Sequence, residues 1–184
     1  RCRQRIRLTY KVYVFKYQIL KARVVYSRVG PPAIVAAIKR HNALFAFEES
    51  GKIIYPHQNY LSDSGLATAY LLEHLAKHNL HLSTIVDSFP QYYQLKRAID
   101  CPNELKEAVT NHALAVVKNE FAEAEVITKD GVKVVFPDGW LLLRPSGTEP
   151  VYRCFAEARE KKRAQELLNL GLRLIADVLT ATSK

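Results

Sequence analysis

The chain has 184 residues, 48% of them hydrophobic, and its 27 Lys and Arg against 18 Asp and Glu give a net charge of +9. This length and composition fit one large or two small globular domains. No apolar run approaches the ~18 residues that span a bilayer, and no signal-peptide pattern is present, so we expect a cytoplasmic protein without a membrane partner. Its three widely spaced cysteines predict reduced thiols and not a disulfide framework.

The basic charge is concentrated at the start of the chain. Residues 1–47 hold eleven of the Lys and Arg and no Asp or Glu, and four arginines alternate with other residues over positions 1–7. Basic and aromatic residues are then interleaved up to Tyr17, a mixture that can hold a nucleic-acid backbone and stack bases. A nucleic-acid-binding protein acting through residues 1–28 is therefore one alternative, and a solvated basic strand is the other. The patch is short and the rest is slightly acidic, so nucleic acid is not an expected partner.

Periodicity predicts alternating strands and helices in the first part of the chain. Residues 64–78 carry an apolar stripe typical of a helix, with Asp63 or Ser62 as its N-cap. The predicted elements are strands at 5–17, 23–27, 43–47 and 53–55, helices at 32–41 and 64–78, and a helical turn at 82–86. These define an α/β module over residues 1–90.

Residues 91–184 predict a different kind of module. Asp130-Gly131 and Pro137-Asp138-Gly139 are turn signals between apolar runs, which indicates antiparallel strands. The predicted elements are a linker or strand at 90–102, a helix at 104–121 capped by Asn103, strands near 124–128, 132–136, 140–144 and 151–157, and a helix at 160–180. We therefore expect an α+β C-terminal domain with a four-stranded antiparallel sheet and two helices.

The segment between the last two predicted strands carries the chemistry of an anion site. Arg144 supplies a planar fork of donors that matches phosphate oxygens, and Arg153 follows in the next strand. Ser146 and Thr148 add hydroxyl donors, and a turn containing Gly147 can form a nest of backbone amides. From the residues alone, a structural turn between strands remains an alternative.

The amino-acid sequence of this region resembles that of a known family. Gly139-Trp140, the run from Arg144 to Pro150 (Arg-Pro-Ser-Gly-Thr-Glu-Pro), Arg153 and Glu157 resemble the C-terminal domain of the α-D-phosphohexomutases, the phosphomannomutase and phosphoglucomutase enzymes. By this resemblance the phosphate contacts are Arg144, Ser146, Gly147, Thr148 and Arg153. Residues 1–22 have no counterpart in the resemblance.

A second loop resembles the sugar-specificity loop of the same family, usually Gly-Gly-Glu-x-Ser-Gly-His. Here residues 46–52 read Ala-Phe-Glu-Glu-Ser-Gly-Lys, so the paired glycines and the histidine are replaced. By resemblance Glu48 and Ser50 bind the sugar hydroxyls and Lys52 stands in the position of the histidine. Arg28, before Gly30, is a candidate substrate contact, although an ordinary solvated arginine is favoured.

The resemblance implies a phosphohexomutase that interconverts hexose 1-phosphate and hexose 6-phosphate, of mannose or glucose, through a phosphoserine. The serine loop and the Asp-rich Mg²⁺ loop of that family do not occur in this sequence, so no catalytic residue is assigned. Because the chain also lacks Met and begins with Arg1, we expect the C-terminal portion of a larger enzyme, inactive alone. Mg²⁺ is expected for the full-length enzyme and not for this chain.

The expected partners are a phosphosugar substrate and the missing N-terminal domains. A non-catalytic phosphosugar- or anion-binding module is the second alternative. His74 and His78 are one helical turn apart, but no nearby ligand completes a metal site, so a solvated helix face is favoured.

Overall fold

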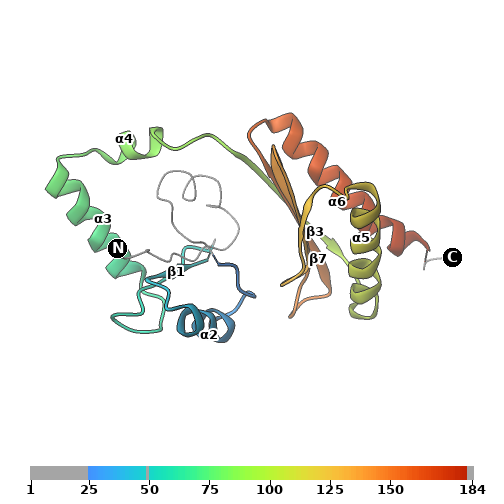
Figure 1. Ribbon diagram of the computed structural model, residues 1–184, viewed down its shortest axis with the longest axis horizontal. Helices are drawn as coiled ribbons and strands as arrows, with labels where there is room; N and C mark the ends of the chain where they lie inside the picture. Colours follow the sequence, from blue (N-terminus) through green and yellow to red (C-terminus); the bar gives the residue numbers. More distant parts are fainter. Residues whose placement is uncertain (1–24, 49, 182–184) are drawn as a thin grey trace. The chain divides into compact units, whose positions relative to one another are not determined.

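The computed structural model describes residues 25–48 and 50–181. The chain divides into two compact units, residues 1–90 and 91–184 (Figure 1). The strand predicted at 5–17 lies outside the described residues. The strand predicted at 23–27 is wrong over its described part, because residues 25–28 have an irregular backbone.

The described residues of the first unit form a short hairpin and three helices. Its elements are α2 (Pro31–His41), β1 (Ala46–Phe47), β2 (Ile53–Ile54), α3 (Ser64–His78) and α4 (Leu82–Asp87). Strands β1 and β2 pair antiparallel, with Ala46 opposite Ile54. Two residues of α2, Ile34 and Ile38, are buried with Ala43, Ala46 and Ile54 in one cluster. This cluster fixes the end of α2 against the base of the hairpin.

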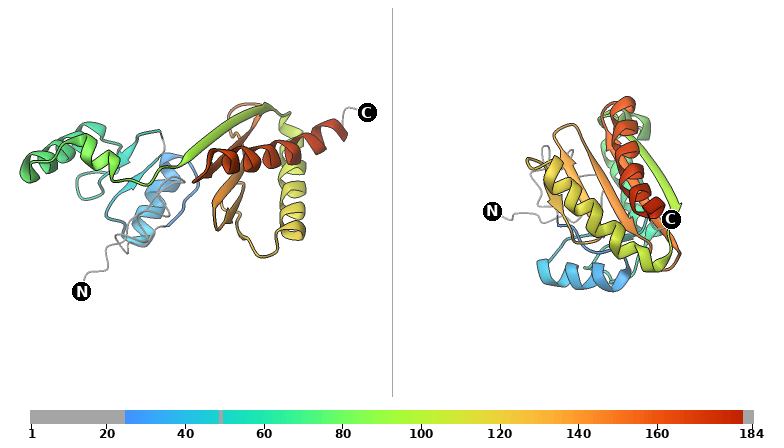
Figure 2. Two further views of the ribbon diagram at one scale, coloured as in Figure 1. Left: turned by 90° about the horizontal axis from the view of Figure 1, so that it is seen from above. Right: turned by 90° about the vertical axis from the view of Figure 1, so that its right-hand side faces the viewer.

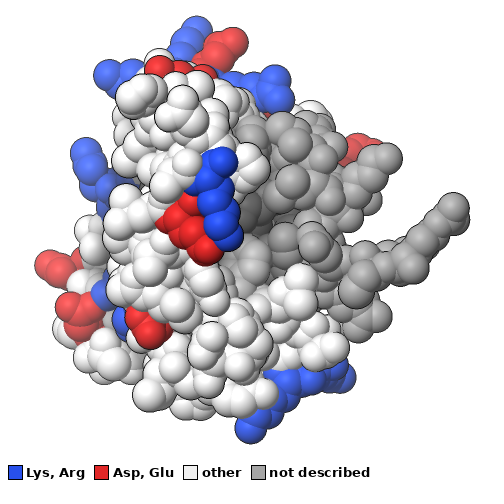
Figure 3. All heavy atoms as spheres, turned by 90° about the vertical axis from the view of Figure 1, so that its left-hand side faces the viewer, with Lys and Arg blue, Asp and Glu red and all other residues white. Residues whose placement is uncertain are grey.

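Helix α3 begins where the sequence predicts. The Asp63 carboxylate accepts a hydrogen bond from the Leu66 N–H at 2.8 Å, so Asp63 is the N-cap. The predicted apolar stripe is not buried, however: no residue of α3 is buried, and Leu72 is 60% exposed. Figure 3, which views the side on which α3 lies, shows broad uncharged areas with scattered charged side chains.

The second unit is an antiparallel sheet covered by helices. Its elements are β3 (Tyr93–Asp100), the 3₁₀ turn η1 (Asn103–Leu105), α5 (Lys106–Glu120), β4 (Glu125–Ile127), β5 (Val132–Phe136), β6 (Gly139–Pro145), β7 (Val151–Ala158) and α6 (Lys161–Ala181). The sheet has five strands in the order β3-β7-β6-β5-β4. The prediction of four strands was wrong because residues 93–100 add an edge strand beside β7.

Helices α5 and α6 lie on the same face of this sheet (Figures 1 and 2). Alternate residues of β5, β6 and β7, including Val134, Leu141 and Cys154, form one core with Val109 of α5 and Leu167 of α6. The alternation follows from the period of two in a strand, which sends successive side chains to opposite faces. Leu142, Arg144 and Arg153 therefore lie on the face opposite the helices.

Close packing of α6 on the sheet depends on a glycine. A Cβ at Gly171 would be 2.5 Å from the Cys154 Sγ, so a side chain at this position would force the neighbouring atoms to shift. Burial raises the pKa of the Cys154 thiol to about 12. Nearby in the same core, the hydroxyl groups of Tyr152 and Thr110 are 2.7 Å apart.

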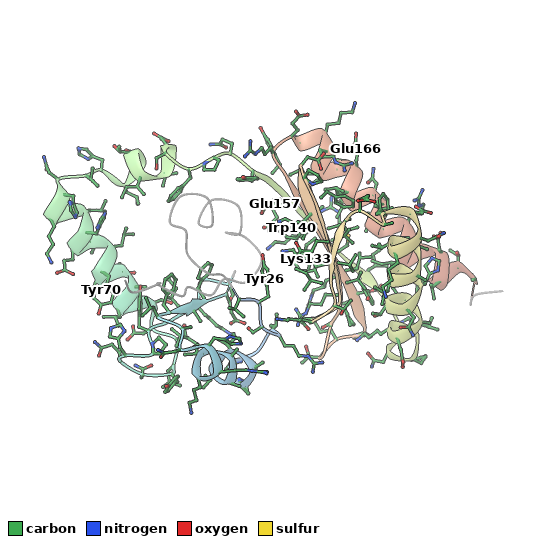
Figure 4. The ribbon with its side chains drawn as sticks, in the orientation of Figure 1. Tyr26, Tyr70, Lys133, Trp140, Glu157 and Glu166 are labelled. Carbon is green, nitrogen blue, oxygen red and sulfur yellow. The ribbon has the colours of Figure 1, made fainter. Side chains whose placement is uncertain are left out.

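The opposite face of the sheet carries a buried polar group. The Trp140 Nε1–H donates to the Glu157 carboxylate at 3.1 Å, and the Lys133 Nζ lies 4.7 Å from the centre of the Trp140 ring (Figure 4). Lys133 is 3% exposed, and this burial lowers its pKa to about 8. The sheet therefore holds a cation, an aromatic ring and a carboxylate together on the face that includes Arg144 and Arg153.

Candidate functional site

The two predicted phosphate-binding arginines are brought together by strand pairing. Strands β6 and β7 pair so that Arg144 is directly opposite Arg153. Residues directly opposite in an antiparallel pair share one face, with their Cβ atoms roughly 5 Å apart. Both guanidinium groups therefore leave the sheet on the same side, at the end where residues 146–150 connect the strands.

Each arginine has a carboxylate partner. The Arg144 Nε lies 2.9 Å from the Asp130 Oδ2, without the geometry of a hydrogen bond, and Arg153 forms an ion pair with Glu149. Two like charges this close repel each other, so nearby anions lower the free energy of the pair. Asp130 and Glu149 supply this negative charge in the structure.

Ser146 is engaged within the loop. It is 3% exposed, and its hydroxyl oxygen accepts a hydrogen bond from the Glu149 N–H at 3.2 Å. The same hydroxyl lies 3.5 Å from the Glu149 Oε2, and the Ser146 N–H donates to the Val151 carbonyl at 3.0 Å. These contacts close the loop into a tight turn, so Ser146 shapes the turn in this state.

Gly147 and Thr148 form the outer edge of the loop. Both are exposed, and among the described residues neither backbone N–H has a hydrogen-bond partner. A Cβ at Gly147 would meet nothing within 4 Å, so the space beside this backbone is open. Two free amides next to two arginines make an arrangement that can accept an anion.

Lys106 completes the loop, and the sequence reasoning missed it. Its Nζ donates to the carbonyl oxygens of Ser146 and Glu149, both at 2.6 Å, and to the Asn103 Oδ1 at 2.7 Å. Asn103 is therefore not the predicted N-cap of a helix, because its side chain binds Lys106 and α5 begins at Lys106. No local pattern links positions 40 residues apart, so the sequence carried no signal for this contact.

The predicted sugar loop is the turn of the β1–β2 hairpin. The Glu48 N–H donates to the Lys52 carbonyl at 2.8 Å and the Gly51 N–H donates to the Glu48 carbonyl at 3.1 Å. Gly51 has a φ of 84°, a conformation that favours glycine. Ser50 is exposed at the tip of this turn. The replacement of the paired glycines by Ala46 and Phe47 is accommodated because both lie in strand β1.

A cavity of about 170 Å³ lies beside this turn, and Glu48, Lys52, Tyr60 and Ser62 contribute to its lining. The Glu48 side chain is 12% exposed, and the Lys52 Nζ lies 3.6 Å from its Oε2. The cavity thus has an ion pair at its rim, while most of its wall is apolar. Arg28 is exposed and lies before Gly30, the N-cap of α2.

A cluster of candidate metal ligands is not found in the described part of the chain. Across residues 25–48 and 50–181 no group of three or more His, Cys, Asp and Glu is placed to hold a metal ion. The rings of His74 and His78 are 4.5 Å apart, with no third ligand among the described residues. In the same ranges, no helix has the length and apolar character that crossing a membrane requires.

Both units match one protein family. Residues 99–169 match the C-terminal domain of the phosphoglucomutase/phosphomannomutase family, and residues 16–93 match its alpha/beta/alpha domain III. The second match corrects the expectation that residues 1–22 have no counterpart in the family, because it begins at residue 16.

Individual proteins agree with these matches. The chain is 34% identical over 158 residues to a phosphoglucomutase/phosphomannomutase of Thermococcus kodakarensis, covering 86% of this chain and 34% of that protein. It is 37% identical over 158 residues to a phosphoglucosamine/phosphogalactosamine mutase of Sulfurisphaera tokodaii, covering 85% of this chain and 34% of that protein. The chain thus spans about a third of the length of the curated relatives it matches.

Solved structures show the same fold. A phosphoglucomutase/phosphomannomutase family protein from Burkholderia thailandensis superposes with a TM-score of 0.77 at 23% identity, covering 95% of this chain and 37% of that one. The architecture is that of two consecutive domains of a phosphohexomutase. The chain belongs to the phosphoglucomutase/phosphomannomutase family and comprises its domain III and C-terminal domain.

Proposed function

We propose that this chain is the phosphosugar-recognition part of a phosphohexomutase that interconverts hexose 1-phosphate and hexose 6-phosphate. The observation that carries the proposal is the direct register of Arg144 and Arg153 beside a turn with two free backbone amides. The phosphate contacts are Arg144, Arg153, the amides of Gly147 and Thr148, and the hydroxyls of Ser146 and Thr148. Paired guanidinium groups and turn amides are the donors that proteins use for phosphate.

In this proposal the β1–β2 turn binds the sugar. The Glu48 carboxylate accepts hydrogen bonds from two neighbouring hydroxyl groups, and the Lys52 Nζ, 3.6 Å from the Glu48 Oε2, helps to orient it. Ser50, at the tip of the turn, adds a third polar contact. Glucose and mannose phosphates share the hydroxyls that Glu48 reads, so both are candidate substrates. The names of relatives add glucosamine phosphate to the candidates.

The chemistry requires more than these residues. Phosphoryl transfer needs a nucleophile and neutralisation of the developing charge, which we assign to a phosphoserine and a Mg²⁺ ion held by other domains of the enzyme. The role of this chain is to hold the phosphate that does not react, so that remote binding energy orients the sugar. A phosphate site separate from the reacting carbon also lets the sugar bind in two opposite orientations.

The experiment is a calorimetric titration of the full chain with glucose 1-phosphate, mannose 1-phosphate and inorganic phosphate. Arg144→Ala is expected to weaken all three by roughly tenfold or more, since a charged hydrogen-bonding partner is lost. Arg173→Ala removes the same charge from an α6 side chain that is 62% exposed, and it is expected to leave binding unchanged. Equal effects of the two variants would contradict a specific phosphate site.

Glu48→Gln separates the sugar contact from the phosphate contact. We expect weaker binding of the sugar phosphates and unchanged binding of inorganic phosphate, because Glu48 touches only the sugar in this proposal. A loss of equal size for inorganic phosphate would refute the assignment of Glu48.

A further inference from the structure

All three N–H donors of the Lys106 ammonium group have acceptors, two in the turn at residues 146–149 and one on Asn103. An ammonium has three N–H donors and no acceptor. Lys106 has three acceptors within 2.7 Å: the carbonyl oxygens of Ser146 and Glu149, and the side chain of Asn103. The two loop carbonyls are 40 and 43 residues from it in the chain. Lys106 therefore joins the start of α5 to both ends of the turn.

The geometry of the peptide bond turns this contact into a constraint on the loop amides. In a trans peptide the carbonyl of one residue and the N–H of the next point in opposite directions. No peptide bond among the described residues is cis. Because the Ser146 carbonyl points at Lys106, the Gly147 N–H points away from Lys106, and Gly147 itself is exposed.

The Glu149 carbonyl is held in the same way, but the next residue is Pro150, which has no N–H. This second contact therefore contributes no donor. Its consequence is electrostatic: two carbonyl oxygens, each with partial negative charge, are kept against a cation. A loop free to rotate these peptides would present oxygens to an incoming phosphate, and the anion would be repelled.

We infer that Lys106 is a positioning residue that fixes the turn at residues 146–149 so that the Gly147 amide faces the bound phosphate; this inference rests on the proposed function. Lys106 does not touch the phosphate. It acts through the direction of two peptide groups, and its removal leaves Arg144 and Arg153 in place while the amide loses its fixed direction.

The test uses the full chain with Lys106→Met and inorganic phosphate as the probe. We expect phosphate binding to weaken by roughly tenfold, because fixed donors lose their geometry. The amide resonance of Gly147 in a ¹H–¹⁵N spectrum is expected to move in Lys106→Met even without phosphate. Lys118→Met removes the same charge from an exposed position on α5 and is expected to change neither property.

Lys106→Arg separates charge from geometry. It keeps the positive charge, but the planar guanidinium cannot aim three converging donors at these acceptors, so we expect roughly threefold or greater loss of phosphate affinity. This variant also carries the test if Lys106→Met fails to fold. Wild-type affinity and an unmoved Gly147 resonance in Lys106→Arg would overturn the inference.

The outcomes distinguish this inference from the proposed function. If the wild-type chain binds no phosphate, or Arg144→Ala binds as well as the wild type, the proposed function fails. If the wild type binds and Arg144→Ala does not, while a folded Lys106→Met binds normally, the proposed function stands and the role of Lys106 is refuted.

Discussion

Gly171→Ala tests how closely α6 approaches the sheet. A Cβ at this position would lie 2.5 Å from the Cys154 Sγ, 2.8 Å from the Leu141 Cδ1 and 2.9 Å from the Leu143 Cδ2. In a helix with free space the change to Ala stabilises by about 1 kcal/mol, whereas overpacking a well-packed core costs about 1–3 kcal/mol. The second effect is the larger, so we expect a net loss of about 1 kcal/mol in the free energy of unfolding.

In a Cys154→Ala background we expect the gain in helix propensity from Gly171→Ala to equal or exceed the cost of overpacking. The sulfur is the nearest obstacle, and the two leucine contacts are with the ends of flexible side chains. With the sulfur removed, Gly171→Ala is expected to be neutral or stabilising, which gives a coupling energy of about 1–2 kcal/mol between the two positions.

The assay is urea unfolding followed by tryptophan fluorescence. The chain has one tryptophan, Trp140 in β6, so the signal reports on the second unit. The reasoning is refuted if Gly171→Ala stabilises the protein with Cys154 intact. It is also refuted if the change has the same effect in both backgrounds to within about 0.5 kcal/mol, the usual limit of additivity.

Three further predictions concern charged and titrating groups. Glu149→Gln removes the carboxylate that pairs with Arg153, an exposed ion pair worth up to about 1 kcal/mol, so inorganic phosphate is expected to bind roughly twofold to fivefold tighter; weaker binding would contradict this. Because burial raises the pKa of Cys154 from 9.0 to about 12, the unfolded chain ionises first and the free energy of unfolding falls between pH 9 and 12. This thiol contributes up to about 1.4 kcal/mol per pH unit to the fall in the free energy of unfolding. Urea unfolding at several pH values should show a smaller slope in Cys154→Ala than in the wild type. Burial also lowers the pKa of Lys133 to about 8, so Trp140 fluorescence is expected to change with a midpoint near that pH and to lose this step in Lys133→Met; a midpoint near 10.5 would refute the assignment.

The sequence predicted those elements whose stability comes from local pattern. Turn signals at Gly131 and Gly139 located the strands on either side of them, and apolar periodicity located α6. Strand β3 was left undecided because its pattern is weak. It lies at the sheet edge, and its core-side positions alternate between the apolar residues Leu95 and Ile99 and the exposed Arg97. An edge strand is defined by its partner β7, which lies more than 50 residues away in the chain.

The candidate site divides in the same way. The sequence of one short segment predicted Arg144 and Arg153 as site residues, but their facing register depends on how β6 and β7 pair. Asp130 and Lys106 were not found, because each reaches the loop from a distant part of the chain through a single side chain. For α3 the sequence predicted an apolar face, but the structure leaves that face unburied. Periodicity indicates which residues share a face and does not indicate what packs against them.

The facing arginines also bear on how binding responds to ionic strength. Asp130 and Glu149 form ion pairs with Arg144 and Arg153, so in the proposed phosphate site an arriving phosphate would replace a carboxylate of the protein as the partner of an arginine. Fewer dissolved ions are displaced in such an exchange than from bare guanidinium groups. Affinity for phosphate should therefore vary only weakly between dilute and concentrated salt, and a Glu149→Gln protein, deprived of its tethered anion, should be the more salt-sensitive of the two.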